Sequence, residues 1–155
     1  MRKFFFLSIV CLLAWSMNAQ EYVDLGLPSG TKWKDQNETE LYTCIAARAE
    51  FGNSLPTYQQ FEELKEHCMW IWTDNGYKVL GSNGNFILLP KTNNFRYCNG
   101  EWEESLGSSM PIGRYWSSTA VGTEQAWLLQ FNWNGSGMTY AEKCFWYNVR
   151  LVQNP

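Results

Sequence analysis

The only histidine of the 155-residue chain, His67, lies between Glu66 and Cys68. A cysteine beside a histidine is the pair from which thiol nucleophiles are built, so these residues are the first candidates for catalysis. They fall in a segment with helical spacing, however, and consecutive residues on a helix do not face one another. A histidine near the carboxyl end of a helix also has a plain structural role, because its positive form interacts favourably with the last carbonyl groups. We therefore expect no catalytic residue here.

The common catalytic motifs are missing from the rest of the sequence. There is no Gly-x-Ser-x-Gly nucleophile turn, no His-Glu-x-x-His zinc motif and no phosphate-binding loop. Metal sites are also disfavoured, because no cysteines have Cys-x-x-Cys spacing and the only aspartates are Asp24, Asp35 and Asp74. The sequence thus predicts a non-catalytic protein with no metal and no cofactor.

Aromatic side chains offer most of the binding chemistry, since the chain has nine Trp, eight Tyr and nine Phe. Strand-like positions assign one group to the core: Trp33, Ile87, Trp116, Trp127 and Phe131. A second group lies beside a glycine turn, in a long loop or crowded in one short stretch, and strand side chains alternate between faces, so some should be exposed. Exposed Trp and Tyr beside Asn favour contacts with proteins or sugars. The predicted ligand-binding residues are Trp102, Trp133, Asn134, Tyr140, Phe145, Trp146 and Tyr147.

The alternative interpretation is that this second group covers a small, loop-rich core.

The amino-terminal segment has the order of features found in secretory signal peptides. Arg2 and Lys3 supply positive charge, residues 4–15 form a nearly unbroken apolar run, and Ala19 offers a small residue for cleavage. Twelve apolar residues are too few for a spanning helix, which needs about 20. We expect residues 1–19 to be removed on export from the cytoplasm.

A membrane anchor or a buried first helix are the alternatives to export, and lipidation of Cys11 is disfavoured by the bulky Val10 before it. After cleavage, residues 20–155 are expected to form a single domain of a secreted protein. That domain has ten basic and fifteen acidic residues and no basic cluster, so we expect it to bind neither nucleic acid nor an anionic membrane. No later segment is apolar enough to span a bilayer.

Export would place the remaining cysteines in an oxidising compartment, where disulfides form. An even number is left: Cys44, Cys68, Cys98 and Cys144. Four cysteines allow three pairings, and their spacing does not choose among them.

Two helices are predicted in the first half of the chain. Residues 40–51 have apolar positions at helical spacing, and Gly52 and Asn53 end the run. A second helix begins after Pro56, where Thr57 and Gln60 have the spacing of a capping box.

Strands are predicted at residues 22–25 and 31–33, and the chain becomes strand-rich after the second helix. Residues 77–80 and 85–89 flank a glycine turn and indicate a hairpin, whereas residues 93–111 read as a loop. Further strands are expected at residues 115–118, 126–132, 138–142 and 148–152. This distribution of elements predicts an α+β fold.

Several of these segments, in order, resemble the Fibrobacter succinogenes major paralogous domain, a family of secreted proteins from Bacteroidetes and relatives. The first match is the opening stretch at residues 22–33 (YVDLGLPSGTKW), and the resemblance runs to about Val152. The other matching segments are residues 55–57 with Glu63, Leu64 and Cys68, the hairpin residues 76–79, 84–85 and 87–90, and residues 115–119, 126–127, 131–132 and 149–152.

The resemblance implies a C-type-lectin-like fold, in which the terminal strands pair in one sheet and the helices pack beneath it. It further implies a Cys98–Cys144 disulfide, which leaves Cys44 and Cys68 for a second. Trp146 stands where the family often has glycine, and residues 91–95 also depart from its usual small residues before Arg-Tyr-Cys. The calcium-binding triplets of sugar-binding C-type lectins are absent.

The expectation is therefore an exported, non-catalytic binding module that recognises a protein or glycan through a C-terminal surface rich in aromatic residues and Asn. Two alternatives remain: a structural or accessory subunit of a cell-surface assembly, and a catalyst similar to the sulfatase-modifying formylglycine enzymes.

Overall fold

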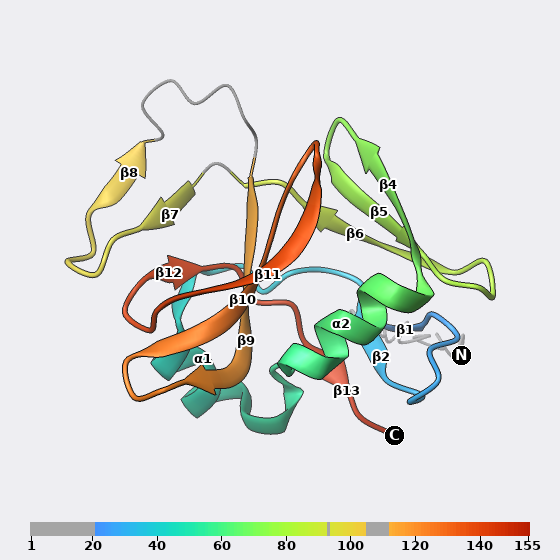
Figure 1. Cartoon of the computed structure of the whole chain (residues 1–155), viewed down its shortest axis with the longest axis horizontal. Helices are drawn as coiled ribbons and strands as arrows, with labels where there is room; N and C mark the ends of the chain where they lie inside the picture. The colour runs from blue at the N-terminus through green and yellow to red at the C-terminus, as the bar shows by residue number, and fades with distance from the viewer. Residues whose placement is uncertain (1–20, 93, 105–111) are drawn as a thin grey trace, which may run out of the picture.

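The computed structural model describes residues 21–92, 94–104 and 112–155, with the backbone alone at Asn94 and residues 102–104. The fold is α+β, as predicted: two short helices accompany four small antiparallel sheets (Figure 1). The expected leader, residues 1–19, lies outside the described part of the chain. No helix among the described residues has the length and apolar character needed to cross a membrane.

The two ends of the described chain meet in one sheet. Strands β1 (Tyr22–Asp24) and β13 (Val152–Gln153) both pair with β2 (Lys32–Lys34), in the order β1-β2-β13. The terminal strands thus share a sheet but do not pair directly with each other, because β2 lies between them. Trp33 of β2 is fully buried in the main core.

The first helix is shorter than predicted. The chain forms strand β3 (Tyr42–Thr43) before helix α1 (Cys44–Phe51) begins, and the Thr43 hydroxyl accepts a hydrogen bond from the Ala46 amide as its N-cap. A single 3-10 turn, η1 (Gly52–Ser54), then leads toward the second helix.

The second helix, α2 (Tyr58–His67), begins as predicted. The Thr57 hydroxyl accepts from the Gln60 amide at 3.2 Å, and the Gln60 side chain accepts from the Thr57 amide at 2.9 Å. This capping box satisfies two amide donors of the first turn. Phe61 and Leu64 form the buried face of the helix.

The predicted hairpin is strands β5 (Gly76–Leu80) and β6 (Phe86–Pro90), but a third strand precedes it. Strand β4 (Met69–Thr73) follows α2 directly and pairs with β5. Its Trp70 and Trp72 side chains pack against the main core.

The segment predicted as a loop between residues 93 and 111 contains two strands. Strands β7 (Asn94–Arg96) and β8 (Trp102–Glu104) form a hairpin, and β7 also pairs with β12 (Trp146–Tyr147), which pairs with β3. The long-loop prediction was therefore wrong for these six residues, because short strands with turn-rich flanks lack a clear alternation.

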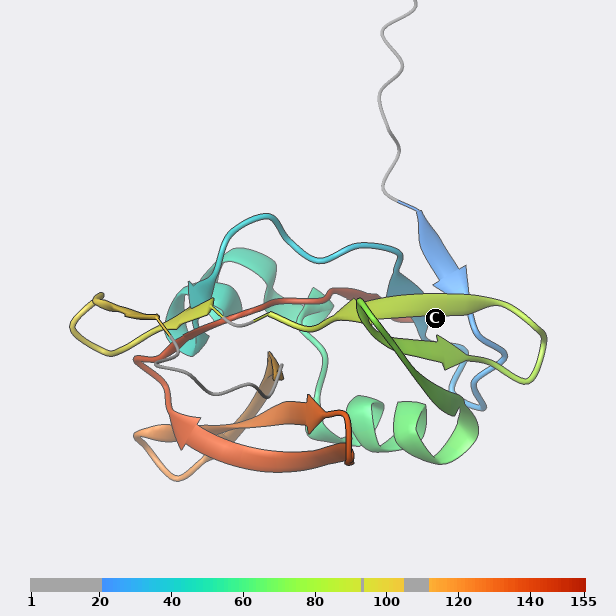
Figure 2. The ribbon, with the colours of Figure 1, turned by 90° about the horizontal axis from the view of Figure 1, so that it is seen from above.

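The longest strands form a three-stranded meander of β9 (Gly113–Val121), β10 (Gln125–Asn132) and β11 (Gly135–Glu142). Helix α2 packs against this meander. Figure 2 shows α2 and the meander strands β10 and β11 on one side of the molecule, and α1 on the other side. The segment between β12 and β13 runs through the middle, where Arg150 is fully buried.

Four of the five predicted core residues are buried: Trp33, Ile87, Trp116 and Phe131. Trp127 is only partly buried, because it faces the start of α2 rather than the centre of the core.

Candidate functional site

The residues predicted to bind a ligand do not gather at one place. Trp133 and Asn134 form the exposed turn between β10 and β11, and Tyr140 lies on β11, five residue pairs away along the same hairpin. At about 3.4 Å per residue, the turn and Tyr140 are separated by about 17 Å. Trp146 lies in β12, which belongs to a different sheet, and Phe145 directly precedes this strand.

The two remaining predicted residues are Tyr147, whose side chain is buried, and Trp102, whose side chain lies outside the described part of the chain. Tyr147 is only 5 % exposed and packs against Trp116 with ring centroids 4.8 Å apart, so it belongs to the core, and its assignment to a contact surface was wrong. Its position in β12 places it on the inner face because neighbouring side chains alternate. The backbone of Trp102 lies in β8, but its side chain lies outside the described part of the chain.

Tyr140 belongs to a row of three aromatic rings. The ring of Tyr140 lies edge-on to that of its cross-strand partner Trp127, with centroids 5.5 Å apart. The Trp127 ring in turn lies 4.8 Å from that of Tyr58, the first residue of α2. Tyr140 is 52 % exposed, while Trp127 and Tyr58 are partly buried. The row therefore presents an aromatic surface whose orientation is fixed by ring contacts below it.

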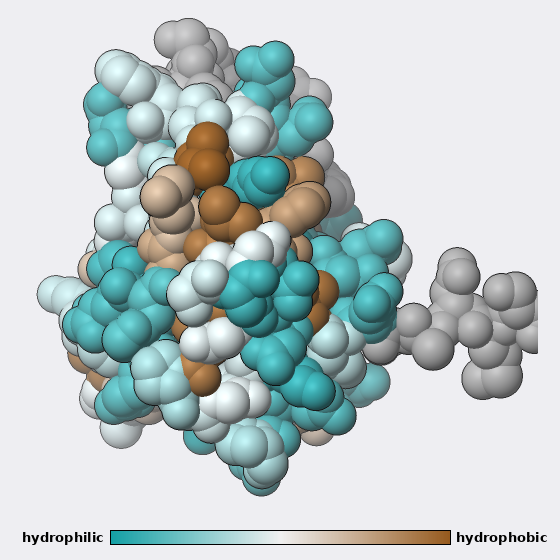
Figure 3. Space-filling model, turned by 90° about the vertical axis from the view of Figure 1, so that its right-hand side faces the viewer, coloured by the Kyte–Doolittle hydropathy of each residue, from teal (hydrophilic) through white to brown (hydrophobic). Residues whose placement is uncertain are grey.

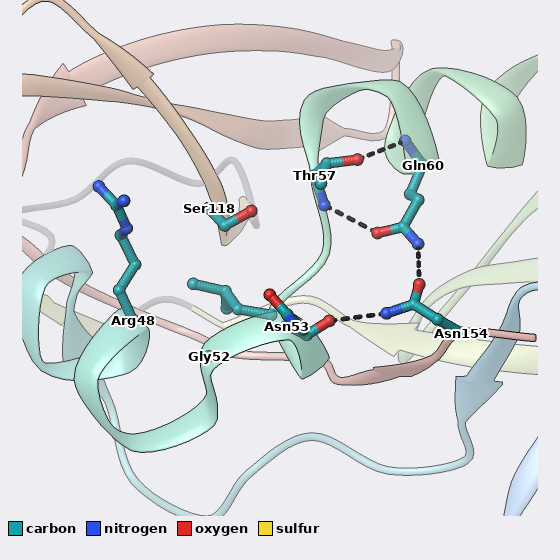
Figure 4. Close-up of a pocket in the computed structure, with 8 residues that line it drawn as sticks. Arg48, Gly52, Asn53, Thr57, Gln60, Ser118 and Asn154 are labelled. Carbon is teal, nitrogen blue, oxygen red and sulfur yellow. Dashed lines mark hydrogen bonds between the residues drawn. The ribbon is translucent and has the colours of Figure 1, made fainter.

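A polar cleft lies at the start of α2, where Thr57, one of its lining residues, precedes Tyr58 of the row. It has a volume of about 470 Å³ and is lined by side chains and backbone from α1, η1, α2, β9 and the carboxyl end of the chain (Figure 4). The lining residues are Arg48, Gly52, Asn53, Leu55, Thr57, Gln60, Ser118 and Asn154.

A chain of hydrogen bonds fixes one side of the cleft. The side-chain nitrogen Nε2 of Gln60 donates to Asn154 Oδ1 at 2.7 Å, and Asn154 Nδ2 donates to the backbone carbonyl of Asn53 at 2.9 Å. The Gln60 oxygen is held by the Thr57 amide within the capping box. Arg48 and Ser118 lie across the cleft from this chain (Figure 4).

The aromatic row and the cleft are held together through the amino-terminal end of α2. The Tyr58 amide donates to Thr119 Oγ1 at 2.9 Å, and the Ser118 amide donates to the Pro56 carbonyl at 2.8 Å. These two bonds join the start of α2 to β9.

The cleft is lined by amides, hydroxyls and one cation. None of its lining residues is Asp, Glu, His or Cys. Two side-chain ion pairs are found among the described residues, Lys34–Glu38 and Lys65–Glu62. Neither of them includes Arg48, which is exposed. Such a lining can donate and accept hydrogen bonds with hydroxyl groups and attract a carboxylate.

Trp146 lines a second, smaller cavity of about 260 Å³. The guanidinium of Arg96 lies over its ring, 5.7 Å from the centroid, and Thr92, Asn148 and the Thr39–Leu41 segment complete the walls. The buried Asn148 amide donates to Thr92 Oγ1 at 2.8 Å and to the Arg114 carbonyl at 2.9 Å, which binds this wall to β9.

Phe145 lies on the opposite face of the chain from Trp146, against Tyr147 and Tyr97, with ring centroids 5.8 Å and 6.1 Å away. The aromatic residues near β12 thus split into two groups on opposite faces of the chain, and Trp146 lines the smaller cavity.

The disulfide expected from the resemblance, Cys98–Cys144, is present, and it joins the turn after β7 to the turn before β12. Glu142 Oε2 lies 3.8 Å and 3.6 Å from the two sulfur atoms. These three residues form the one cluster of potential metal ligands in the described part of the chain, but both sulfurs are used by the disulfide.

The second expected disulfide is not formed, because Cys44 and Cys68 are free. Cys44 begins α1 and packs with Trp116, whereas Cys68 follows α2 and packs against the separate main core. Burial raises the pKa of both thiols, that of Cys68 to about 11 with Glu63 as a second cause. Both are therefore poor nucleophiles at neutral pH.

No local sequence pattern indicated the cleft. Arg48, Gln60 and Asn154 come from three distant segments, and Gln60 could be recognised only as a helix cap. Comparison with protein-family models, curated proteins and solved structures found no match in any of the three.

Proposed function

We propose that the chain is an exported, non-catalytic binding module that holds a glycan on the aromatic row and the adjoining cleft. The observation that carries this proposal is the combination of the exposed Tyr140 ring, supported by Trp127 and Tyr58, with a polar cleft at the start of the helix that Tyr58 begins. Sugars offer apolar C–H faces to aromatic rings and hydroxyl groups to amides, so they use both parts of such a site.

The charge of the site favours an acidic or neutral sugar. Arg48 gives the cleft a positive group, and no carboxylate lines it. A uronic or other carboxylated sugar would therefore gain an ionic contact that a basic ligand would not.

Export and fold are parts of the same proposal. The leader-like residues 1–19 and the Cys98–Cys144 disulfide support an oxidising destination. The arrangement of both terminal strands in one sheet, with two helices between them in the sequence, supports the C-type-lectin-like fold that the family resemblance implies.

The test is binding of the mature protein to an array of neutral and carboxylated glycans, followed by calorimetric titration of the strongest ligand. We expect Tyr140→Ala to weaken binding about tenfold, because a stacking contact of this kind contributes about 1 kcal/mol or slightly more. Phe86→Ala is the matched control: Phe86 is 51 % exposed but lies in another sheet, and its removal should leave the affinity unchanged.

Arg48→Gln separates the two parts of the site. For a carboxylated glycan it should weaken binding, whereas for a neutral one it should have little effect. A Tyr140→Ala protein with unchanged affinity, or a loss of affinity caused by Trp133→Ala alone, would place the site elsewhere and contradict the proposal.

A further inference from the structure

The outer face of the β4–β5–β6 sheet is apolar although it lies at the surface. Burial alternates along its strands: Trp70 and Trp72 point into the core, while Met69 and Ile71 are 63 % and 39 % exposed. On β6, Phe86 is likewise 51 % exposed. The outward positions of a strand usually carry polar residues when no partner covers them.

Cross-strand pairing arranges these outward residues in two complete rows. The first row is Met69, Leu80 and Phe86, and the second is Ile71, Lys78 and Leu88. Five of the six side chains are apolar, and Lys78 occupies the centre of the second row. Figure 3 looks onto this side of the molecule, where apolar surface gathers in the upper part, over the β4–β5–β6 sheet.

The size of the face limits the kind of occupant. Strands about 4.8 Å apart and same-face residues about 6.8 Å apart give the face an area of about 300 Å² with its margins. A stable dimer buries about 800 Å² on each partner, so this face alone is too small for one. With its margins, the face is about 18 Å long across its three strands. It matches the footprint of one helix, which is about 10 Å wide and covers that length with about twelve residues.

The charge of the face points to an acidic occupant. Lys78 Nζ lies 4.2 Å from the centre of the Phe86 ring, so the ammonium group is held over the apolar surface. Neither of the two side-chain ion pairs found among the described residues includes Lys78. A second copy packed face to face about a central axis would bring two Lys78 groups together, which like-charge repulsion disfavours.

We propose that this face docks an amphipathic helix of a partner protein, whose apolar side chains flank a carboxylate that pairs with Lys78. Apolar contacts with Met69, Ile71 and Phe86 supply most of the binding energy, and the ion pair fixes the position of the helix. The inference uses other residues than the glycan site and does not depend on it.

The test uses two synthetic twelve-residue helical peptides with leucines around a central glutamate or, in the second, a central lysine. We expect the mature protein to bind the glutamate peptide about threefold more tightly, measured by fluorescence anisotropy at low salt. Lys78→Glu should reverse this preference. Lys32→Glu, the same charge change at an exposed site on β2, should preserve it.

Ile71→Ser tests the apolar part and should weaken binding of both peptides, while circular dichroism establishes that each variant is folded. The proposal is overturned if neither peptide shows saturable binding, if both bind with equal affinity, or if Lys32→Glu reverses the preference. A concentration-dependent dimer that Ile71→Ser abolishes would overturn it too, because the occupant would then be a second copy.

Discussion

Arg150 is the charged side chain on which the centre of the fold depends most. It is fully buried, and its guanidinium donates to four oxygens: Asn37 Oδ1 at 2.8 Å and the carbonyls of Lys34, Asp35 and Leu88 at 3.0, 3.2 and 2.6 Å. One side chain thereby joins the segment after β2, strand β6 and the segment before β13. Burial removes water from the guanidinium and lowers the pKa of Arg150 to about 10.

Replacing Arg150 by methionine keeps an apolar stem but removes every donor. Each buried acceptor left without a partner costs about 1–3 kcal/mol, and four acceptors are affected. The desolvation penalty of the guanidinium is recovered in the same step, which offsets part of this loss. We expect Arg150→Met to lower the free energy of unfolding by about 3 kcal/mol net.

Urea unfolding of the mature protein measures this change directly. With a denaturant slope of about 1–3 kcal/mol per molar, the midpoint should fall by about 1–3 M. Arg48→Met is the matched control, because Arg48 is exposed and its removal should leave the midpoint nearly unchanged. An Arg150→Met protein with the midpoint of the control would refute the reasoning, since the four hydrogen bonds would then have no net effect on stability.

Two further changes test the packing and the thiols. A methyl group at Gly113 would meet the ring of its cross-strand partner Phe131, so Gly113→Ala should cost about 1–3 kcal/mol in thermal unfolding, whereas Gly137→Ala meets open space and should not. Because the pKa of Cys68 rises from 9.0 to about 11 on folding, its contribution to stability is complete below pH 9 and is lost as the pH rises through 11. The wild type should therefore lose more stability than Cys68→Ala between pH 8 and 11, and parallel pH curves would contradict this.

Local signals predicted the elements that depend on local chemistry. The capping box of Thr57 and Gln60 and the glycine turn between β5 and β6 act over a few residues, so the sequence was enough to place them. Strand β4 was missed for an opposite reason. Its residues 69–72 are apolar on both faces, so the polar and apolar alternation of a half-buried strand is absent.

The cysteine pairing and the exposure of the aromatic residues depend on tertiary contacts, so local sequence patterns could not predict them fully. The pairing of Cys44 with Cys68 was wrong because the ends of α1 and α2 pack into different parts of the core. The alternation rule correctly implied that some of the aromatic residues are exposed, but only the strand register decides that Tyr140 points outward and Tyr147 inward.

Helix α2 connects the two surfaces to which we assign binding. Its first residue, Tyr58, ends the aromatic row, and its last residue is followed within two positions by β4. The Trp70 indole donates to the Leu64 carbonyl at 3.2 Å, which fixes β4 to the helix. Ten helical residues separate the two surfaces by about 15 Å, so we expect the proposed glycan and partner helix to bind at the same time. Because they share no side chain, Tyr140→Ala and Lys78→Glu should act independently, and we expect their effects on the two ligands to be separable in one double variant.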